Sequence, residues 1–269
     1  MDTEVKPNSD AASWEFLPEH PLVVVFTYLK PSDRLNAGLT CKAWSECLKH
    51  PVLWRRFVCR FTTPGHEKLV SAVVNDGHRI RALVLEVDQQ NIGNRTNACR
   101  ALHSLAENEQ RRLTSFTLRF VGENPFLYAG SDFMAELRLL FGCAQDKTEP
   151  FSYLTHVDLS RVNVVFESKL IDILSENQPQ LEFLNIQNKS LVCKVDPDSI
   201  VRLASNCRKL RDLRLINVSV NDEVLSTFAA LDEPCLEHLS MAYTRETKFT
   251  LEQSSEVWSA LVKRLRSFE

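Results

Sequence analysis

Three potential metal ligands lie close together early in the chain. Cys41, Cys47 and His50 fall within ten positions, and zinc is commonly bound by thiolate and imidazole groups. This spacing is not a common zinc pattern, however, and Trp44, Cys47 and Leu48 fall on one face of an expected helix. We therefore expect the cysteines to pack as small apolar groups and to bind no metal.

No other motif predicts catalysis. The sequence has only seven glycines, and it lacks a phosphate-binding glycine loop, a G-x-S-x-G nucleophile elbow and an H-E-x-x-H zinc motif. The seven histidines are scattered along the chain. Spacing alone does not exclude a triad assembled in space from distant residues. The prediction is a protein that is not an enzyme and that uses no cofactor.

Composition narrows the class of protein further. The chain has 269 residues, of which 44% are hydrophobic and 25% charged, and this is typical of a folded protein. Its formal net charge of -3 provides no basic field for nucleic acid, and its longest apolar run is too short to span a bilayer. None of the eight cysteines forms a C-x-x-C pair, which favours reduced thiols. We expect an intracellular protein of the cytoplasm or nucleus, without nucleic-acid or membrane partners.

A short helical region follows a polar tail at residues 1–12. Apolar residues first recur at i, i+3, i+4 and i+7. This spacing predicts a short helix with one apolar face that carries Leu22, Val25, Phe26 and Leu29. The K-P-S-D segment ends this helix, and Ser32 or Asp33 can cap a second one. The second helix carries Leu35 and Leu39, and the third carries Trp44, Cys47 and Leu48 and ends at Pro51.

This helical region is rich in apolar side chains for its size. Three short helices in about forty residues seldom form a sufficient core. Trp44 and Trp54 alone would each bury roughly 150 to 250 Å². Part of the apolar surface is therefore expected to contact a partner.

The remainder of the chain repeats one strand pattern. Six segments have apolar residues at positions one, four and six of L-x-x-L-x-L, the strand signature of leucine-rich repeats, and they begin at Ile80, Leu113, Leu154, Leu181, Leu210 and Leu236. The last three intervals are 27, 29 and 26 residues. Helical patterns lie between the later strands, at residues 166–177, 196–207 and 221–232. The predicted fold class is therefore α/β, a divergent solenoid with a parallel sheet on its concave side.

The turns after these strands depart from the usual repeat. The ninth position, where an Asn or Cys normally bonds to the turn, holds Val162, Lys189 and Val218. Asn188 and Asn217 fall one place early. Either the turns are reshaped around these two residues, or both are ordinary loop residues.

The helical region closely resembles an F-box. The matching elements are Leu17-Pro18, the apolar helix, Asp33 with Leu35, T-C-K-A-W and P-V-L-W, in the family's order and spacing. Cys207, three residues before Leu210, resembles the cysteine-containing repeats of F-box proteins. The resemblance covers most of the chain, with an F-box at 13–60 and repeats at 61–269. Pro21 departs from the F-box pattern and should fall in the first turn of a helix that begins near His20.

The resemblance implies a function. F-box and leucine-rich-repeat proteins are substrate-recognition subunits of cullin-RING ubiquitin ligases; they bind the Skp adaptor, and through it a cullin. The conjugating enzyme carries the thioester chemistry, so no catalytic residue is expected here. The expected adaptor contacts are Leu17, Pro18, Phe26, Leu29, Leu39, Trp44 and Trp54. Alternatively, Trp44 and Trp54 are core residues of the small helical domain. An F-box scaffold that does not direct ubiquitination and a plain repeat-type binding module remain as alternatives.

The concave sheet is the expected substrate surface. Residues between the core leucines alternate onto that face, and the candidates are His156, Asp158, Phe183, Asn185, Asp212 and Arg214. A merely solvated sheet face is the competing interpretation. Phe183 and Arg214 favour binding most, because exposed aromatic and Arg side chains are enriched in hot spots. The substrate itself is not identified by the sequence.

The last residues contain the start of a further repeat. Leu265 lies 29 residues after Leu236 and is followed by Phe268, so we expect the chain to be cut off within a seventh repeat of a longer protein. The alternative is one helix carrying Val257, Leu261, Leu265 and Phe268, which would cap the solenoid.

Overall fold

A computed structural model describes residues 17–63, 65–123, 130–142, 153–188, 190, 192–231, 236–243 and 253–268. The polar tail expected at residues 1–12 lies outside these ranges. The chain divides into two compact units, one up to Arg55 and one from Arg56 onward, and each is described by itself.

Helices form the first unit, and prolines set where they begin. It contains α1 (Glu19–Thr27), α2 (Pro31–Ala37), α3 (Lys42–Cys47) and a 3-10 turn at Pro51–Leu53. Pro31 and Pro51 occupy the first position of their helices, where a missing N–H costs no intrahelical bond. Pro21 lies in the first turn of α1 for the same reason, and the expected start near His20 is confirmed to within one residue.

Several details of the predicted helices were wrong, and Leu29 and Leu48 lie beyond the ends of α1 and α3. Leu22, Val23 and Phe26 are buried on α1, whereas Val25 is 47% exposed, because α1 packs on α3 and on the 3-10 turn through a face rotated from the one predicted. The N-cap of α2 is Lys30, without a side-chain bond. Pro31 fixes the helix start there, so the expected caps Ser32 and Asp33 lie inside the first turn, and Leu39 lies beyond its end.

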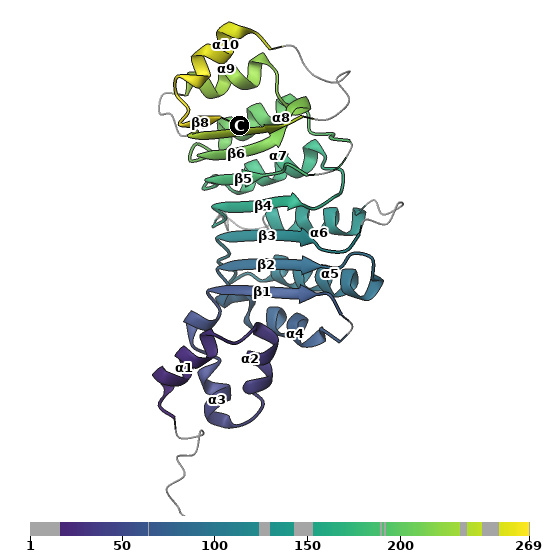
Figure 1. Cartoon of the computed structure of the whole chain (residues 1–269), viewed down its shortest axis with the longest axis vertical. Coiled ribbons are helices and arrows are strands. Elements are labelled where there is room, and N and C mark those ends of the chain that lie inside the picture. Colours follow the sequence, from purple (N-terminus) through teal and green to yellow (C-terminus); the bar gives the residue numbers. More distant parts are fainter. Residues whose placement is uncertain are drawn as a thin grey trace, which may run out of the picture. The chain divides into compact units, whose positions relative to one another are not determined.

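A parallel sheet runs through the second unit in chain order, as Figure 1 shows. Among the described residues its strands are β1 (Arg56–Phe61), β2 (Ala82–Val87), β3 (Ser115–Phe120), β4 (His156–Arg161), β5 (Phe183–Asn185), β6 (Asp212–Ile216), β7 (His238–Ala242) and β8 (Ser267–Phe268). Each strand pairs with the next one in sequence. This arrangement confirms the predicted repeat solenoid.

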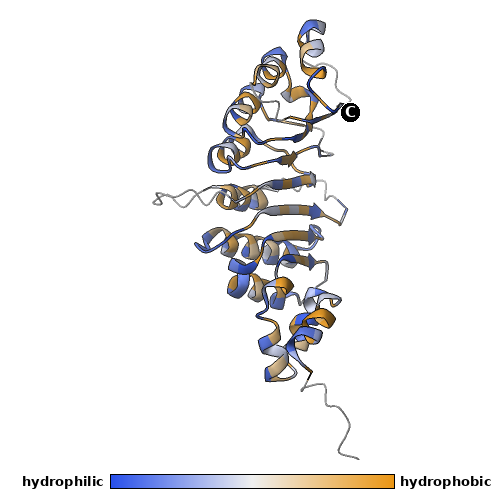
Figure 2. Cartoon of the chain, turned by 90° about the vertical axis from the view of Figure 1, so that its left-hand side faces the viewer, coloured by the Kyte–Doolittle hydropathy of each residue, from blue (hydrophilic) through white to orange (hydrophobic). Residues whose placement is uncertain are grey.

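Helices cover one face of this sheet and leave the other open (Figure 2). They are α4 (Glu67–Asp76), α5 (Ile92–Glu107), α6 (Ser131–Phe141), α7 (Ser168–Asn177), α8 (Pro197–Asn206), α9 (Asp222–Ala230) and α10 (Ser255–Val262). The core lies between the two layers, where the repeat leucines, such as Leu184 and Leu213, are fully buried. None of the described helices has the length and hydropathy of a membrane span.

Every predicted repeat segment forms a strand. In each of the six, the strand begins two residues after the first apolar position, at Ala82, Ser115, His156, Phe183, Asp212 and His238. Strand β1 was not predicted, because Arg56–Phe61 alternates between exposed and buried residues but does not have the leucine spacing of the repeats. The expected F-box at 13–60 therefore overlaps the first strand of the sheet, and its residues 13–16 lie outside the described residues.

The reshaped-turn interpretation holds for Asn188. Its side-chain Nδ2 donates to the backbone oxygens of Val162 and Val164 in the preceding repeat, at 3.0 and 2.6 Å. Asn217, one repeat later, is completely buried. Asn188 is therefore part of the turn, one place earlier than in the usual repeat, and Asn217 begins the 3-10 turn Asn217–Ser219. Lys189 lies outside the described residues.

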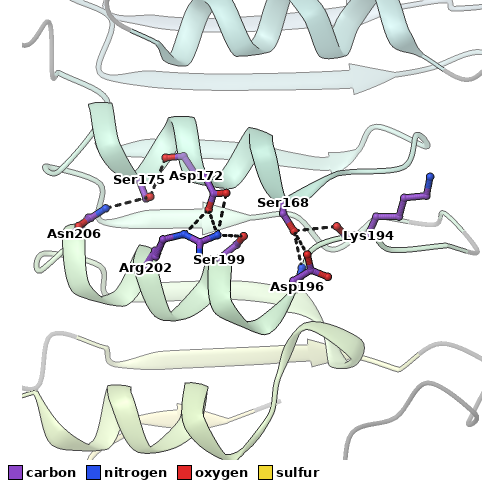
Figure 3. Close-up of polar contacts among 8 residues, drawn as sticks. All are labelled: Ser168, Asp172, Ser175, Lys194, Asp196, Ser199, Arg202 and Asn206. Atoms are coloured by element: carbon purple, nitrogen blue, oxygen red, sulfur yellow. Dashed lines mark hydrogen bonds and ion pairs between the residues drawn. The ribbon is translucent and has the colours of Figure 1, made fainter.

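Polar side chains connect neighbouring helices on the outer layer (Figure 3). Arg202 of α8 donates to both carboxylate oxygens of Asp172 on α7, at 2.8 to 3.0 Å. Ser168, at the start of α7, donates to Asp196 Oδ2 at 2.9 Å. The layer is thus held in register by contacts between one repeat and the next.

The final residues form a strand. Helix α10 ends at Val262, and Ser267–Phe268 pairs with β7 as β8, so the alternative of one helix from Val257 to Phe268 is wrong. Backbone pairing to Glu237 at the edge of the sheet draws this segment away from the helix. That the chain is cut from a longer protein stays a prediction.

Candidate partner-binding surfaces

The first unit displays only part of the predicted adaptor-binding set. Pro18 is exposed and Leu39 is 74% exposed, so both are available to a partner. Leu17, Leu29 and Trp44 are half-buried. The role of these five residues in binding an adaptor stays a prediction.

Phe26 and Trp54 belong to the core instead. They are 1% and 3% exposed, which supports the core interpretation of Trp54, while the expected contact of both residues with an adaptor stays a prediction. Phe26 packs edge-on against Trp44, with ring centroids 5.5 Å apart, and the Trp54 indole N–H donates to the backbone oxygen of Leu48. A unit this small needs its largest side chains to fill its interior.

An exposed apolar stripe on α1 was missed by the sequence analysis. Pro21, Val24, Val25 and Tyr28 follow at i, i+3, i+4 and i+7 and are all exposed, Tyr28 by 85%. The opposite side of α1 carries the buried residues. One signal in the sequence could have predicted this stripe. The helix is apolar on all sides, and this is typical of a helix that is covered on more than one side.

A buried arginine connects the helices of this unit. Arg34 is 8% exposed, and its guanidinium donates to the backbone oxygens of Phe26 at 3.1 Å, Leu29 at 3.2 Å and Leu53. Burial lowers the pKa of Arg34. The three carbonyls come from the end of α1, the following loop and the 3-10 turn, so one side chain fixes their separation.

The two cysteines and the histidine of the sequence motif have separate local roles. Cys41 is the N-cap residue of α3, Cys47 is buried, and His50 Nδ1 accepts from the Val52 N–H at 3.4 Å. Burial, with a smaller effect of the charge on Glu19, raises the pKa of Cys47 and favours its thiol form. No group of three metal-binding side chains was found in the described part of the chain.

A depression of about 400 Å³ opens beside Leu17 between the start of α1 and the end of α3. Its other lining residues include Leu22, Ala43, Cys47 and Pro51, together with charged Glu19, Glu46 and Lys49. The predicted Leu17 contact thus lies at a partly apolar hollow of the surface.

The six candidate substrate-face residues lie together on one face of the sheet, where five are half-buried and Asn185 is 9% exposed. His156, Phe183 and Asp212 are register partners on β4, β5 and β6. Asp158, Asn185 and Arg214 form the next row of register partners on the same strands. The predicted alternation of the strands therefore placed these side chains correctly, while their use in binding stays a prediction.

Three planar side chains stack across these strands. The rings of His156 and Phe183 are 4.0 Å apart between centroids and nearly parallel, at 9°. The guanidinium of Arg214 lies over the Phe183 ring, 5.4 Å from its centroid, and pairs with both oxygens of Asp212 at 2.9 Å. Cation–π contact and bidentate pairing hold the arginine in one orientation.

The acidic and amide groups beside this stack are also fixed. Asp158 Oδ1 accepts from both the N–H and the hydroxyl of Ser160, at 3.1 and 2.7 Å. Asn185 Oδ1 accepts from the Gln187 N–H at 3.1 Å. Burial lowers the pKa of His156 against the opposing effect of the carboxylates of Asp158 and Asp212, and the Arg214 charge lowers it further. A neutral imidazole therefore lies within a preorganised polar surface.

The geometry defines a class of protein: a three-helix domain with exposed apolar side chains, followed by a leucine-rich-repeat solenoid. The F-box-like family model matches residues 14–60. The chain thus combines an F-box-like domain with repeats, and its homologues over most of its length are named F-box/LRR-repeat proteins.

Three relatives illustrate this similarity. F-box/LRR-repeat protein 8 of Homo sapiens is 29% identical over 221 residues, which cover 81% of this chain and 56% of the relative. F-box/LRR-repeat protein 21 of Mus musculus is 24% identical over 262 residues, 93% of this chain and 57% of the relative. F-box only protein 33 of Homo sapiens is 31% identical over 83 residues, 30% of this chain and 15% of that protein. The chain spans little more than half the length of the first two.

Proposed function

We propose that the chain is a substrate-recognition subunit of a cullin-RING ubiquitin ligase in the cytoplasm or nucleus. Its F-box binds the Skp adaptor, and through it a cullin, while the repeats hold a protein substrate. The chain itself provides recognition and no catalysis.

The observation that carries this proposal is the exposed apolar surface on the F-box-like unit. Leu39 and Tyr28 are 74% and 85% exposed, although both are large apolar groups whose burial is favourable. Leu17 and Pro18 match the start of the F-box pattern. An adaptor that covers these side chains would bury apolar area that the unit alone leaves in water.

The first test measures adaptor binding by the full chain. We expect the double substitution Leu17→Ala, Pro18→Ala to weaken binding of purified Skp adaptor at least about tenfold, because contacts at an apolar interface core contribute over 1 kcal/mol each. Tyr243→Ser, which removes an exposed aromatic group in the repeat unit, is the control and should bind normally. Unchanged circular dichroism shows that the variants are folded. A folded double variant with normal affinity contradicts the assignment of these residues.

The second test separates a substrate receptor from a scaffold. Partners that copurify with the chain in the presence of a proteasome inhibitor are added to a reconstituted ligase. Transfer of ubiquitin to a partner that depends on the chain supports the receptor. Adaptor binding without such transfer indicates a scaffold, and no adaptor binding by the wild type indicates a plain repeat-type binding module.

A further inference from the structure

Four charged side chains form one row across the first four strands of the sheet. Arg60, Glu86 and Arg119 are register partners on β1, β2 and β3. Each lies between two buried residues of its strand, so all three point to the face that the helices leave open (Figure 2). Arg161 continues the row on β4 as the register partner of Arg119. We call these four residues the arginine row.

The arginines of this row are accessible to a partner. The side chains of Arg60 and Arg119 are 48% and 34% exposed, and Arg161 is also exposed. Only 20% of the Glu86 side chain is exposed. The accessible part of the row is therefore mainly cationic.

One carboxylate serves the whole row. Glu86 Oε2 lies 2.6 Å from Arg60 Nε, and Glu86 Oε1 lies 3.7 Å from Arg119 Nη1. Within the described part of the chain, the Arg161 side chain forms no ion pair or hydrogen bond. Three guanidinium charges and one carboxylate charge give the row a net charge of +2.

The other carboxylates close to these strands in the sequence do not pair with the row. Asp158 on β4 uses Oδ1 for two hydrogen bonds within its own strand. Asp88 accepts a backbone N–H within the turn after β2, and Glu123 is exposed in the turn after β3. The ion pairs formed by the described residues join none of these three carboxylates to an arginine of the row.

Arg119 and Arg161 are the members of the row that most need an anion. Like charges directly opposite each other on neighbouring strands destabilise a sheet. The register of β3 and β4 shifts between Thr117 and Arg119, and this shift brings Arg161 level with Arg119. Elsewhere in the sheet, Arg214 has both oxygens of Asp212 as partners. An anion from a partner would supply what Arg119 and Arg161 lack.

We propose that the arginine row binds an acidic segment of a protein partner in extended conformation, with one carboxylate on Arg119 and a second on Arg161. Acidic side chains two residues apart in such a segment lie on one side, about 7 Å from each other, and neighbouring strands are about 5 Å apart. Flexible arginine side chains span this difference, and each guanidinium can then pair with its own carboxylate.

The spread of the charge favours paired carboxylates over one phosphate group. A phosphate concentrates its charge at a single point, whereas the arginines lie on three different strands. The inference rests on the proposed function and deepens it, because it gives the substrate a required feature, an acidic extended segment.

The test titrates short peptides into the full chain, with arginine side chains labelled for NMR. The probes are acetyl-Gly-Glu-Gly-Glu-Gly-amide, the same peptide with glutamine in place of both glutamates, and acetyl-Gly-Gly-phosphoserine-Gly-Gly-amide. The Nε–H signal of Arg161 is assigned by its loss in Arg161→Gln. We expect the acidic peptide to shift this signal saturably, and the other two peptides to bind at least about fivefold more weakly.

Two substitutions in the row should have opposite effects. Arg161→Gln should weaken binding of the acidic peptide at least about fivefold, measured at the Arg119 signal, because one of the two partners is removed. Glu86→Gln should strengthen it about threefold, because Arg60 and Arg119 lose a competing carboxylate. Arg100→Gln removes the same charge as Arg161→Gln from an exposed position on α5 and is the matched control; it should bind like the wild type.

A stability measurement separates binding from a structural role. Arg161→Gln should be at least as stable as the wild type in urea, because it removes a like charge opposite Arg119 and no described side-chain contact. A clear loss of stability in this variant would assign Arg161 to the fold and overturn the proposal.

The binding outcomes are also distinct. Equal affinity for the acidic and glutamine peptides, equal effects of Arg161→Gln and Arg100→Gln, or weaker binding by Glu86→Gln overturns the proposal. Tighter binding of the phosphoserine peptide overturns the assignment to paired carboxylates. The assay contains neither adaptor nor ubiquitin. A failure of adaptor binding therefore removes the ligase assignment and leaves the acidic-segment site, whereas failure of the peptide test removes only the site.

Discussion

Single residues in the first unit have roles that their types alone do not suggest. Arginine is almost never fully buried unless its donors are satisfied. Arg34 meets this condition with the backbone oxygens of Phe26, Leu29 and Leu53, of which the Phe26 oxygen also accepts from the Leu29 N–H at 3.2 Å. The arrangement of the three helices, and with it the surface offered to an adaptor, depends on this contact.

Arg34→Met should therefore destabilise the first unit by about 2–4 kcal/mol, because the backbone oxygens of Leu29 and Leu53 lose the donor that Arg34 provides. Arg34→Lys should restore only part of the loss, since one ammonium does not reproduce a planar fork of donors. Hydrogen exchange of the amides in α1 and α2 measures the effect. Arg55→Met, at an exposed position of the same unit, is the control. Equal protection in Arg34→Met and the wild type would refute this role.

At the scale of elements, the residues that end α7 and α8 connect consecutive repeats. Gln178, three residues before Leu181, donates to the Phe141 oxygen at 3.0 Å and accepts from the Leu154 N–H at 3.3 Å. Cys207 holds the equivalent place before Leu210, and its thiol donates to the Gln178 oxygen at 3.5 Å. The cysteine noted in the sequence and Gln178 thus hold equivalent positions, and both bond to the preceding repeat.

This position should matter more than the exposed ion pairs of the helix layer. Gln178 is 1% exposed, so Gln178→Leu leaves two buried backbone groups unsatisfied and should lower the free energy of unfolding of the repeat unit by about 2–4 kcal/mol. Arg202→Met removes the bidentate pair with Asp172 at the surface and should cost about 0–1 kcal/mol. Urea unfolding of both variants measures the difference. A larger loss for Arg202→Met would reverse this ranking.

At the scale of the whole molecule, the elements of the repeat unit contact mainly elements of the repeats that are adjacent in the sequence. Each strand from β2 to β7 pairs with the preceding and following strands, and helices contact the helices of adjacent repeats. In such an array, stability is approximately a sum of repeat terms and nearest-neighbour interfaces. Damage to one repeat is then expected to remain local.

Leu184→Ala tests this expectation in the middle of the solenoid. Leu184 is completely buried on β5, so the substitution should cost about 2–5 kcal/mol through lost burial and the remaining cavity. Amide exchange should accelerate most in β4, β5 and β6 and least in α1–α3. The control is Val192→Ala at an exposed position. Uniform acceleration over both units would show that the chain unfolds as one cooperative body.

The sequence by itself determined the features that depend on local periodicity. Leucine spacing specified six strands, the alternation within them placed His156, Phe183 and Arg214 on one face, and Pro21 specified the start of the first helix to within one residue. These signals are local because a strand or helix turns its side chains at a fixed angle per residue. The F-box pattern was recognisable for the same reason, as a fixed order of such elements.

Only the tertiary structure decided which apolar residues are left on the surface. Val23 is buried and Val25 exposed because α1 packs on α3 and the 3-10 turn, and periodicity cannot choose between two apolar faces of one helix. Strand β1 exists because β2 offers its edge to Arg56–Phe61, a segment without the repeat spacing. The stack of His156, Phe183 and Arg214 likewise required the register of three strands, since side-chain contacts across a sheet depend on pairing that no single segment encodes.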